Sequence, residues 1–182
     1  KAHSSNEVIV KVNYDGDLED VVEFKLKQHS GRLDLQEDWN DSGSGDIEWG
    51  IMLPADTDVE FSSASGDFSA SGISGDLEGS TASGDFELEG LGGSVDISVA
   101  SGDIDIRNSR GDIEISTASG DIMIENCSGD IELSTASGDI EGSGIEGDDI
   151  EISAASGDID ISKAKGSFDL SVASGDVEAE GI

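Results

Sequence analysis

The sequence has very few positive charges. Only 9 of its 182 residues are Lys or Arg, against 42 Asp and Glu, and the formal net charge is −33. A surface this acidic repels the phosphates of nucleic acids and of anionic lipids, so we expect no nucleic-acid partner. Cations, cationic polymers and mineral surfaces are the partners that such a charge favours.

Cysteine, histidine and long apolar runs are scarce as well. The single cysteine, Cys127, excludes an intramolecular disulfide. No apolar run approaches the roughly 20 residues of a transmembrane helix, so we expect no membrane insertion. Both histidines, His3 and His29, precede the repeats described below, which therefore cannot assemble a Ser-His-Asp or Cys-His constellation. We expect a protein without enzymatic activity.

Glycine, in contrast, is frequent and regularly spaced. It recurs every nine residues from Gly66 to Gly147, and again at Gly157, Gly166 and Gly175 after one inserted residue. The unit reads Gly-Asp-Ile-Glu-Ile-Ser-Thr-Ala-Ser, as at 111–119, and residues 57–65 fit it with Thr57 in place of Gly. A fixed period of this kind is typical of a solenoid.

Within each unit apolar residues alternate with acids. Ile113 and Ile115 are predicted to point inward and Glu114 outward, which is the pattern of a strand with one buried face. A third residue at the corner of this unit, Ala118, is expected to point inward too. Cys127 occupies an inward corner position in another unit, where we expect it to be buried.

Alternate units differ at their ends, so the full period is eighteen residues. One type ends in Ser-x-Ala-Ser, as at 98–101 and 116–119. The other turns through Gly or Asn, or once Lys, at Gly72, Gly90, Asn108, Asn126, Gly144, Lys163 and Gly181. Because Gly and Asn tolerate positive φ, we expect a left-handed residue at this second corner that the first corner lacks.

These patterns predict an all-β fold. Residues 57–182 are expected to form a parallel β-solenoid, a flattened β-roll or β-helix of about seven coils. Each coil would contain 18 residues, as two nine-residue strand–turn units. Residues 1–56 break the period, and stretches such as 8–12, 21–26 and 33–35 read as strands. We predict that 1–56 is an N-terminal β capping segment.

The stretch 49–54 (Trp-Gly-Ile-Met-Leu-Pro), followed by Val59, Phe61 and Ser-Gly-Asp at 65–67, resembles a widespread bacterial family. It is a domain-of-unknown-function family that carries the label of an adhesin, and the resemblance covers nearly the whole chain. The resemblance implies an extracytoplasmic β-solenoid, secreted or at the cell surface, and brings no catalytic residues. The period is also similar to that of calcium-binding RTX β-rolls, whose Gly-Gly-x-Gly-x-Asp turn this sequence lacks.

Columns of carboxylates are the most distinctive candidate site. On one sheet we expect an acidic ladder of Glu60, Glu78, Asp96, Glu114, Glu132, Glu151 and Asp169. Beside the turns we expect an Asp column of Asp67, Asp85, Asp103, Asp121, Asp139, Asp158 and Asp176. Neighbours about 4.8 Å apart in water repel by about 0.9 kcal/mol. Either salt and hydrogen bonds from turn amides relieve this repulsion, or bridging cations such as Ca²⁺ do.

A second candidate precedes the repeats. Asp38, Asn40, Ser42 and Asp46 follow the spacing that opens an EF-hand calcium loop, with Gly43 at the turn. The terminal Glu of that motif is missing, because Trp49 stands in its place. An ordinary polar loop and a Ca²⁺ site both remain open for this segment, and we expect no other cofactor.

The expected function is therefore structural or adhesive: a rigid acidic rod used as a spacer, a filament subunit or a cation-dependent contact surface. A calcium-binding module is the alternative. The chain ends at Gly181-Ile182 without a polar cap, and Lys11, Lys25 and Lys27 lie in the N-terminal segment. Either the natural chain continues beyond this segment, or the open end of the roll docks onto another molecule. In the second case we expect head-to-tail self-association, in which these lysines meet the acidic end of another copy.

Overall fold

The computed structural model describes residues 2–3, 7–15, 22–29, 32–39 and 46–182. In these residues the chain contains strands and no helix, which confirms the all-β fold class. The strands form four sheets, of three, seven, seven and two strands. The chain divides into two compact units: Glu7–Met52, and Leu53–Ile182 together with the first residues of the chain.

The N-terminal unit is built from antiparallel pairs. Strand β2 (Ile9–Asp15) pairs with β5 (Asp46–Pro54), and β3 (Val22–His29) pairs with β4 (Arg32–Trp39). The Trp49 indole donates a hydrogen bond to the Glu37 carboxylate. In the other unit, β1 (Ala2–His3) pairs in parallel with Leu53 and Pro54 at the end of β5. The capping role of residues 1–56 stays a prediction.

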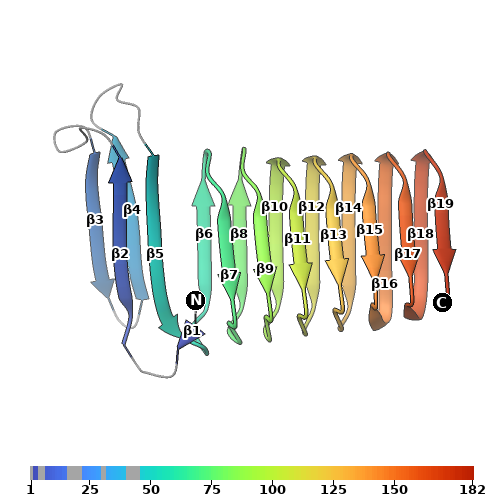
Figure 1. Cartoon of the computed structure of the whole chain (residues 1–182), viewed down its shortest axis with the longest axis horizontal. Helices are drawn as coiled ribbons and strands as arrows, with labels where there is room; N and C mark the ends of the chain where they lie inside the picture. Colours follow the sequence, from blue (N-terminus) through green and yellow to red (C-terminus); the bar gives the residue numbers. More distant parts are fainter. Residues whose placement is uncertain (1, 4–6, 16–21, 30–31, 40–45) are drawn as a thin grey trace. The chain divides into compact units, whose positions relative to one another are not determined.

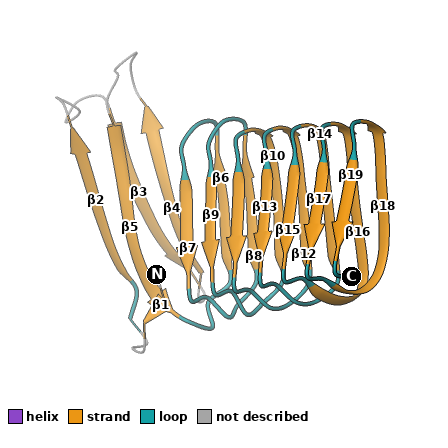
Figure 2. Ribbon diagram, turned by 45° about the vertical axis from the view of Figure 1, so that its right-hand side comes forward, coloured by secondary structure: helices purple, strands orange, loops and turns teal. Residues whose placement is uncertain are grey.

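The second unit is a parallel β-solenoid made of two seven-stranded sheets (Figures 1 and 2). The first sheet contains β6 (Val59–Ser63), β8 (Leu77–Thr81), β10 (Val95–Ser101), β12 (Ile113–Ser119), β14 (Ile131–Ser137), β16 (Glu146–Ser156) and β18 (Lys165–Ser174). The second sheet contains β7 (Phe68–Ser71), β9 (Phe86–Glu89), β11 (Ile104–Arg107), β13 (Ile122–Glu125), β15 (Ile140–Ser143), β17 (Ile159–Ser162) and β19 (Val177–Glu180).

The pairing register confirms the eighteen-residue coil. Ile113 pairs with Ile131 in the first sheet, and Ile104 pairs with Ile122 in the second. A residue therefore stacks on its equivalent one period later, and seven strands in each sheet correspond to seven coils. The inserted residue near Asp148 produces a register shift between Gly147 and Ile150, where β16 pairs with β18. The repeat absorbs the insertion there, and the later coils regain their register.

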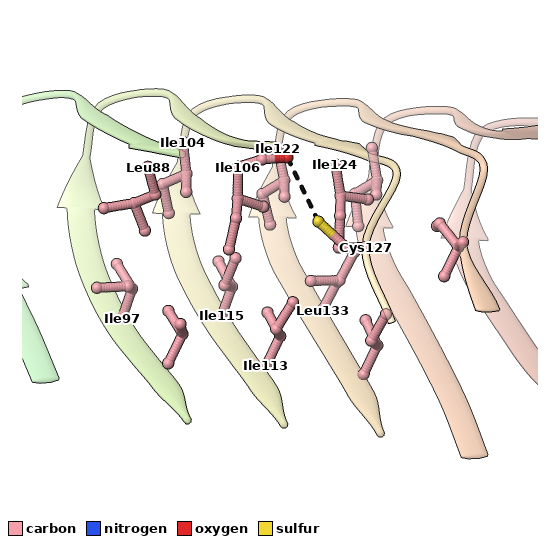
Figure 3. Close-up of a cluster of buried hydrophobic side chains, with 14 of the residues drawn as sticks. Leu88, Ile97, Ile104, Ile106, Ile113, Ile115, Ile122, Ile124, Cys127 and Leu133 are labelled. Atoms are coloured by element: carbon pink, nitrogen blue, oxygen red, sulfur yellow. Dashed lines mark hydrogen bonds between the residues drawn. The ribbon is translucent and has the colours of Figure 1, made fainter. Parts of the chain in front are cut away.

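The core lies between the two sheets. In β12, Ile113, Ile115 and Thr117 are buried while the residues between them are exposed. Figure 3 shows inward side chains of the first sheet, such as Ile115, facing those of the second sheet, such as Ile106. The inward orientation predicted for Ala118 is wrong, because the strand continues its alternation for one more residue. Thr117 therefore points inward and Ala118 lies exposed on the outer side.

The second corner has the left-handed residue that the sequence predicts. Asn108, Asn126 and Lys163 adopt φ of 53–54°, and the glycines at equivalent positions adopt φ of 65–70°. The expectation that the first corner lacks positive φ is wrong. Its glycines, such as Gly102 and Gly120, adopt φ of 139–150°.

Stacking explains the glycines of the first corner. A Cβ built on Gly120 would lie 1.9 Å from the carbonyl oxygen of Gly102 in the preceding coil, far inside van der Waals contact. The same overlap recurs at each step from Gly84 to Gly175. Only glycine permits the coils to approach this closely at the corner.

Pro54 stands where the regular ladder begins. Its position is equivalent to Gly72, whose N–H donates to the carbonyl of Glu89 in the next coil at 2.9 Å. The corresponding residues of later coils, such as Gly90 and Asn108, donate in the same way. Proline has no N–H and cannot make this bond, so the ladder starts after residue 54.

Candidate functional site

The acidic ladder lies on the outer face of the first sheet. Glu60 pairs in register with Glu78, and the pairing continues through Asp96, Glu114, Glu132, Glu151 and Asp169. All seven residues are exposed, and each stands one strand spacing of about 4.8 Å from the next. The structure thus brings the predicted ladder residues together as one straight column of carboxylates.

Two further columns run beside the acidic ladder on the same face, both on its C-terminal side along the strands. A serine column is formed by Ser62, Ser80, Ser98, Ser116, Ser134, Ser153 and Ser171. Neighbouring serine hydroxyls come within hydrogen-bond reach, as between Ser80 and Ser62 at 3.4 Å. Seven exposed alanines follow two residues after the serines in the sequence, at Ala64, Ala82, Ala100, Ala118, Ala136, Ala155 and Ala173. This face therefore repeats acid, serine and alanine in every coil.

The Asp column runs along the first corner and is bonded from coil to coil. The Oδ1 atom of Asp67 accepts the backbone N–H of Asp85 at 3.0 Å, and that of Asp121 accepts the N–H of Asp139 at 2.8 Å. Four more bonds of 2.8–2.9 Å complete the series, at Asp103, Asp121, Asp158 and Asp176 as donors. Hydrogen bonding of turn amides, one of the two foreseen ways of relieving the repulsion, is therefore present.

Whether the Asp column stabilises the stacked coils depends on the free energy of these hydrogen bonds relative to the repulsion between the carboxylates. A hydrogen bond to a charged acceptor contributes about 1.5–3 kcal/mol, and an exposed one lies near the lower limit. The repulsion between neighbouring exposed carboxylates is about 0.9 kcal/mol before salt screening. The bonds therefore outweigh the repulsion, and the Asp column favours stacking.

The second corner carries a shorter version of this arrangement. Asp58 accepts the N–H of Asp76, and Asp76 accepts the N–H of Ser94, both at 3.0 Å. Farther along, a shallow depression of about 470 Å³ lies beside the bulge in β16. Its lining consists of Asp112, Gly129, Asp130, Glu146, Gly147, Asp148, Lys165 and Gly166. Lys165 forms an ion pair with Glu146 at 3.7 Å in this depression.

The predicted calcium loop is only partly described. Asn40 and Ser42 lie outside the described residues, Asp38 lies in β4, and Asp46 is exposed at the start of β5. Within the part of the chain that the structure describes, no group of three or more His, Cys, Asp or Glu side chains is gathered as a metal ion requires. Calcium binding by this loop stays a prediction.

A patch on the second sheet went unnoticed in the sequence. Arg107 forms ion pairs with Asp105 and, at 3.7 Å, with Glu125. Its guanidinium also lies 3.9 Å from the sulfur of Met123, whose side chain is exposed. At the equivalent outward positions of the other coils the sequence has acids or serines. Arg107 and Met123 differ from this pattern, and that difference could have revealed the patch.

Cys127 is buried at the second corner, as expected. Its thiol lies 3.3 Å from the carbonyl oxygen of Glu125 and 3.7 Å from that of Ile106 (Figure 3). Burial raises the pKa of the Cys127 thiol above its ordinary value. Only the thiolate form of cysteine is nucleophilic, and the raised pKa keeps the Cys127 thiol protonated. The side chain therefore acts as a small apolar residue that fills space in the core.

Comparison with known proteins gives a family and no activity. A family model described as Toastrack DUF4097 matches residues 2–181, which is nearly the whole chain. No curated protein and no solved structure matches the chain.

Proposed function

We propose that this chain, which belongs to the Toastrack DUF4097 family, is a non-enzymatic structural protein whose solenoid serves as a stiff acidic rod. The observation that carries the proposal is the continuity of the stack. Seven strands in each sheet share one core, and the Asp column ties each coil to the next. A rod of this kind suits a spacer or a contact surface, because these roles require a long regular structure and do not require a cleft.

The equivalence of the coils supports a protein without catalysis. General acid–base catalysis by two carboxylates requires surroundings that separate their pKa values. Along the acidic ladder, Glu114 and Glu132 share the same strand position, the same exposure and the same kinds of neighbour. A stack of equivalent positions offers no asymmetry by which one carboxylate would act as the acid and its neighbour as the base, which suits a charged surface better than a catalytic pair.

We also propose a secreted or cell-surface location and an adhesive role for the acidic faces. No helix among the described residues has the length and apolar character needed to cross a membrane. The proposal of location rests on the family resemblance seen in the sequence. Protease treatment of intact bacteria that express the natural gene would test it. Complete protection of the protein until the cells are lysed would contradict a surface location.

Head-to-tail stacking of the rods is a further part of the proposal. Strand β2 lies at the edge of its sheet, where Lys11 is exposed together with Val8 and Ile9. At the other end of the chain, β18 and β19 are the last strands of their sheets. Charge favours contact between the lysine-bearing edge of one copy and the acidic coil of another.

Negative-stain imaging and light scattering test the structural proposal together. We expect straight rods that associate end to end as protein concentration rises at physiological salt. The Lys11→Glu variant tests the charge contact, since it should weaken association and leave the circular dichroism spectrum unchanged. A wild-type protein that stays strictly monomeric at high concentration, with and without Ca²⁺, would contradict stacking.

A calcium-binding module is the second candidate, favoured by the column of exposed carboxylates in register. Ca²⁺ prefers six to eight oxygen ligands, and adjacent ladder residues would have to share one ion. Isothermal titration with Ca²⁺ separates the two functions. A few saturable tight sites would favour the module, whereas weak binding that follows ionic strength would favour the structural rod.

A further inference from the structure

The sulfur-containing side chains of this protein differ widely in their access to solvent. The sequence has one cysteine and two methionines. Cys127 is 1% exposed, and Met52 in β5 is half-buried. Met123 points outward from β13, the middle strand of the second sheet, and is 41% exposed. A small molecule in solution therefore reaches Met123 more readily than either of the other two residues.

The position of Met123 tolerates a change in polarity. The residues on either side of it in β13, Ile122 and Ile124, are buried and fill the core in its place. Its register partners on the neighbouring strands are the acids Asp105 and Glu141. A more polar side chain at residue 123 would thus join a polar outer face and leave the packing of the core unchanged.

The guanidinium of Arg107 is held beside the Met123 sulfur. Its Nη2 atom donates a hydrogen bond to Asp105, and its Nε atom lies 3.7 Å from the Glu125 carboxylate. The same Nη2 atom lies 3.9 Å from the Met123 sulfur, which is a weak acceptor. Because arginine has five N–H donors, these two ion pairs leave donors for a further acceptor.

An oxygen atom bound to the Met123 sulfur would be a better acceptor than the sulfur itself. A hydrogen bond from nitrogen to oxygen is about 2.7–3.2 Å long, which is shorter than the 3.9 Å between Nη2 and the sulfur. An oxygen on the side of the sulfur that faces Arg107 would therefore come within hydrogen-bond reach of the guanidinium. The geometry favours the oxidised side chain over the thioether.

We propose that Met123 is a modification site, at which a neutral hydroperoxide such as hydrogen peroxide converts the thioether to a sulfoxide whose oxygen is bound by Arg107. A lone pair of the sulfur attacks one peroxide oxygen, the O–O bond breaks and an S–O bond forms. The sulfur is oxidised by two electrons and the peroxide is reduced. The departing hydroxide takes the proton of the transferred hydroxyl group and leaves as water.

Charge and burial select the oxidant and the target. The net charge of −33, together with the carboxylates of Asp105 and Glu141 next to Met123, repels anionic oxidants and does not repel a neutral peroxide. Cys127 is buried and its thiol stays protonated, so it does not compete for the peroxide. The rod can therefore be oxidised on its surface while its core stays intact.

Oxidation of the whole protein with hydrogen peroxide tests the choice of target. Intact-mass spectrometry counts the oxygen atoms taken up with time, and peptide mapping assigns them to residues. We expect Met123 to react at least about fivefold faster than Met52, since susceptibility follows exposure, and Cys127 to stay unmodified. Met123→Leu should lose the fast phase, and the matched control Met52→Leu should retain it. Equal rates at the two methionines, or earlier oxidation of Cys127, would overturn the proposal.

A second pair of variants tests the hydrogen bond from Arg107. Both carry Met52→Leu, so that Met123 is the only methionine, and one also carries Arg107→Gln. Circular dichroism checks that both are folded before and after oxidation. The change in melting temperature on oxidation should be about 2 °C more favourable in the variant that retains Arg107. The same change in both variants would overturn the assignment of the sulfoxide oxygen to Arg107.

Discussion

The two sheets of the solenoid share one core but differ on their outer faces. The first sheet repeats acid, serine and alanine in every coil. The second sheet carries an irregular series at its first outward position, namely Ser69, Glu87, Asp105, Met123, Glu141, Asp160 and Glu178. Core packing constrains only the inward residues, and these are well packed in both sheets. Packing therefore does not explain why the outer face of the first sheet is uniform. The uniform face is therefore the better candidate for contact with an extended partner.

The largest effect is expected when the inner side of the uniform sheet is broken. Ile115→Asp places a charge among buried side chains and should lower the free energy of unfolding by more than about 3 kcal/mol. Glu114→Gln, the adjacent outward residue, should leave stability unchanged or raise it slightly, because it removes repulsion from two neighbours. Urea denaturation of both variants makes the comparison, and equal losses would mean that the faces are wrongly assigned.

Glycine substitutions compare the two corners in the same way. Gly120→Ala at the first corner should cost about 2–4 kcal/mol, since the added methyl group overlaps the carbonyl of Gly102. Gly90→Ala at the second corner has open space and only a left-handed φ, so it should cost about 1 kcal/mol. Thermal unfolding of the two variants measures the difference. A smaller loss for Gly120→Ala would contradict the close approach of the coils.

Loss of a carboxylate should destabilise the protein more in the Asp column than in the acidic ladder. Asp121→Ala removes the acceptor of the Asp139 N–H and should destabilise the protein by about 1–2 kcal/mol. Glu132→Ala removes a ladder carboxylate that stands between two others and should cost less than about 0.5 kcal/mol. Denaturation midpoints decide the comparison. If the two variants lose the same stability, the hydrogen bonds contribute nothing net.

We expect salt to stabilise the protein mainly by screening the carboxylates of the acidic ladder, on the outer face of the first sheet. Because the ladder carboxylates repel one another, the melting temperature should rise with ionic strength, and more steeply with millimolar Ca²⁺. Each kcal/mol of relieved repulsion corresponds to about 2–4 °C for a chain of this size. A double variant, Glu114→Gln with Glu132→Gln, should show a smaller rise. A melting temperature unchanged by salt and by Ca²⁺ would show that the ladder carries no such penalty.

The smallest effect concerns the buried thiol. Because the folded-state pKa of Cys127 is raised, its contribution to stability is fully present below the ordinary thiol pKa of about 8.5. That contribution is lost as pH rises through the raised folded-state pKa. The Cys127→Ala variant should therefore lose less stability than wild type between pH 8 and pH 10. Parallel curves for the two proteins would show that the thiol does not titrate on unfolding.

Most of the fold could be predicted because the repeat can be recognised directly in the amino-acid sequence. The spacing from Gly111 to Gly120 indicates the unit, and the alternation of Ile113, Glu114 and Ile115 indicates which face is buried. The error at Ala118 came from the corner, where the sequence pattern does not show how far the strand continues. Thr117 is polar, so its inward position was not evident from apolar periodicity.

The candidate site divides in the same way. The ladder from Glu60 to Asp169 follows from the period alone, because residues eighteen apart must stack in such a coil. The patch around Arg107 does not follow from the period, since its contacts depend on side-chain reach between adjacent strands.

The sequence by itself therefore determined the coil length, the inward and outward positions within the strands up to the corners, and the columns of like residues. Each of these depends only on periodicity. The tertiary structure decided that the first-corner glycines have positive φ and that Asp carboxylates accept amides of the next coil. These features depend on the distance between residues of adjacent coils, which is set by how closely two backbones pack.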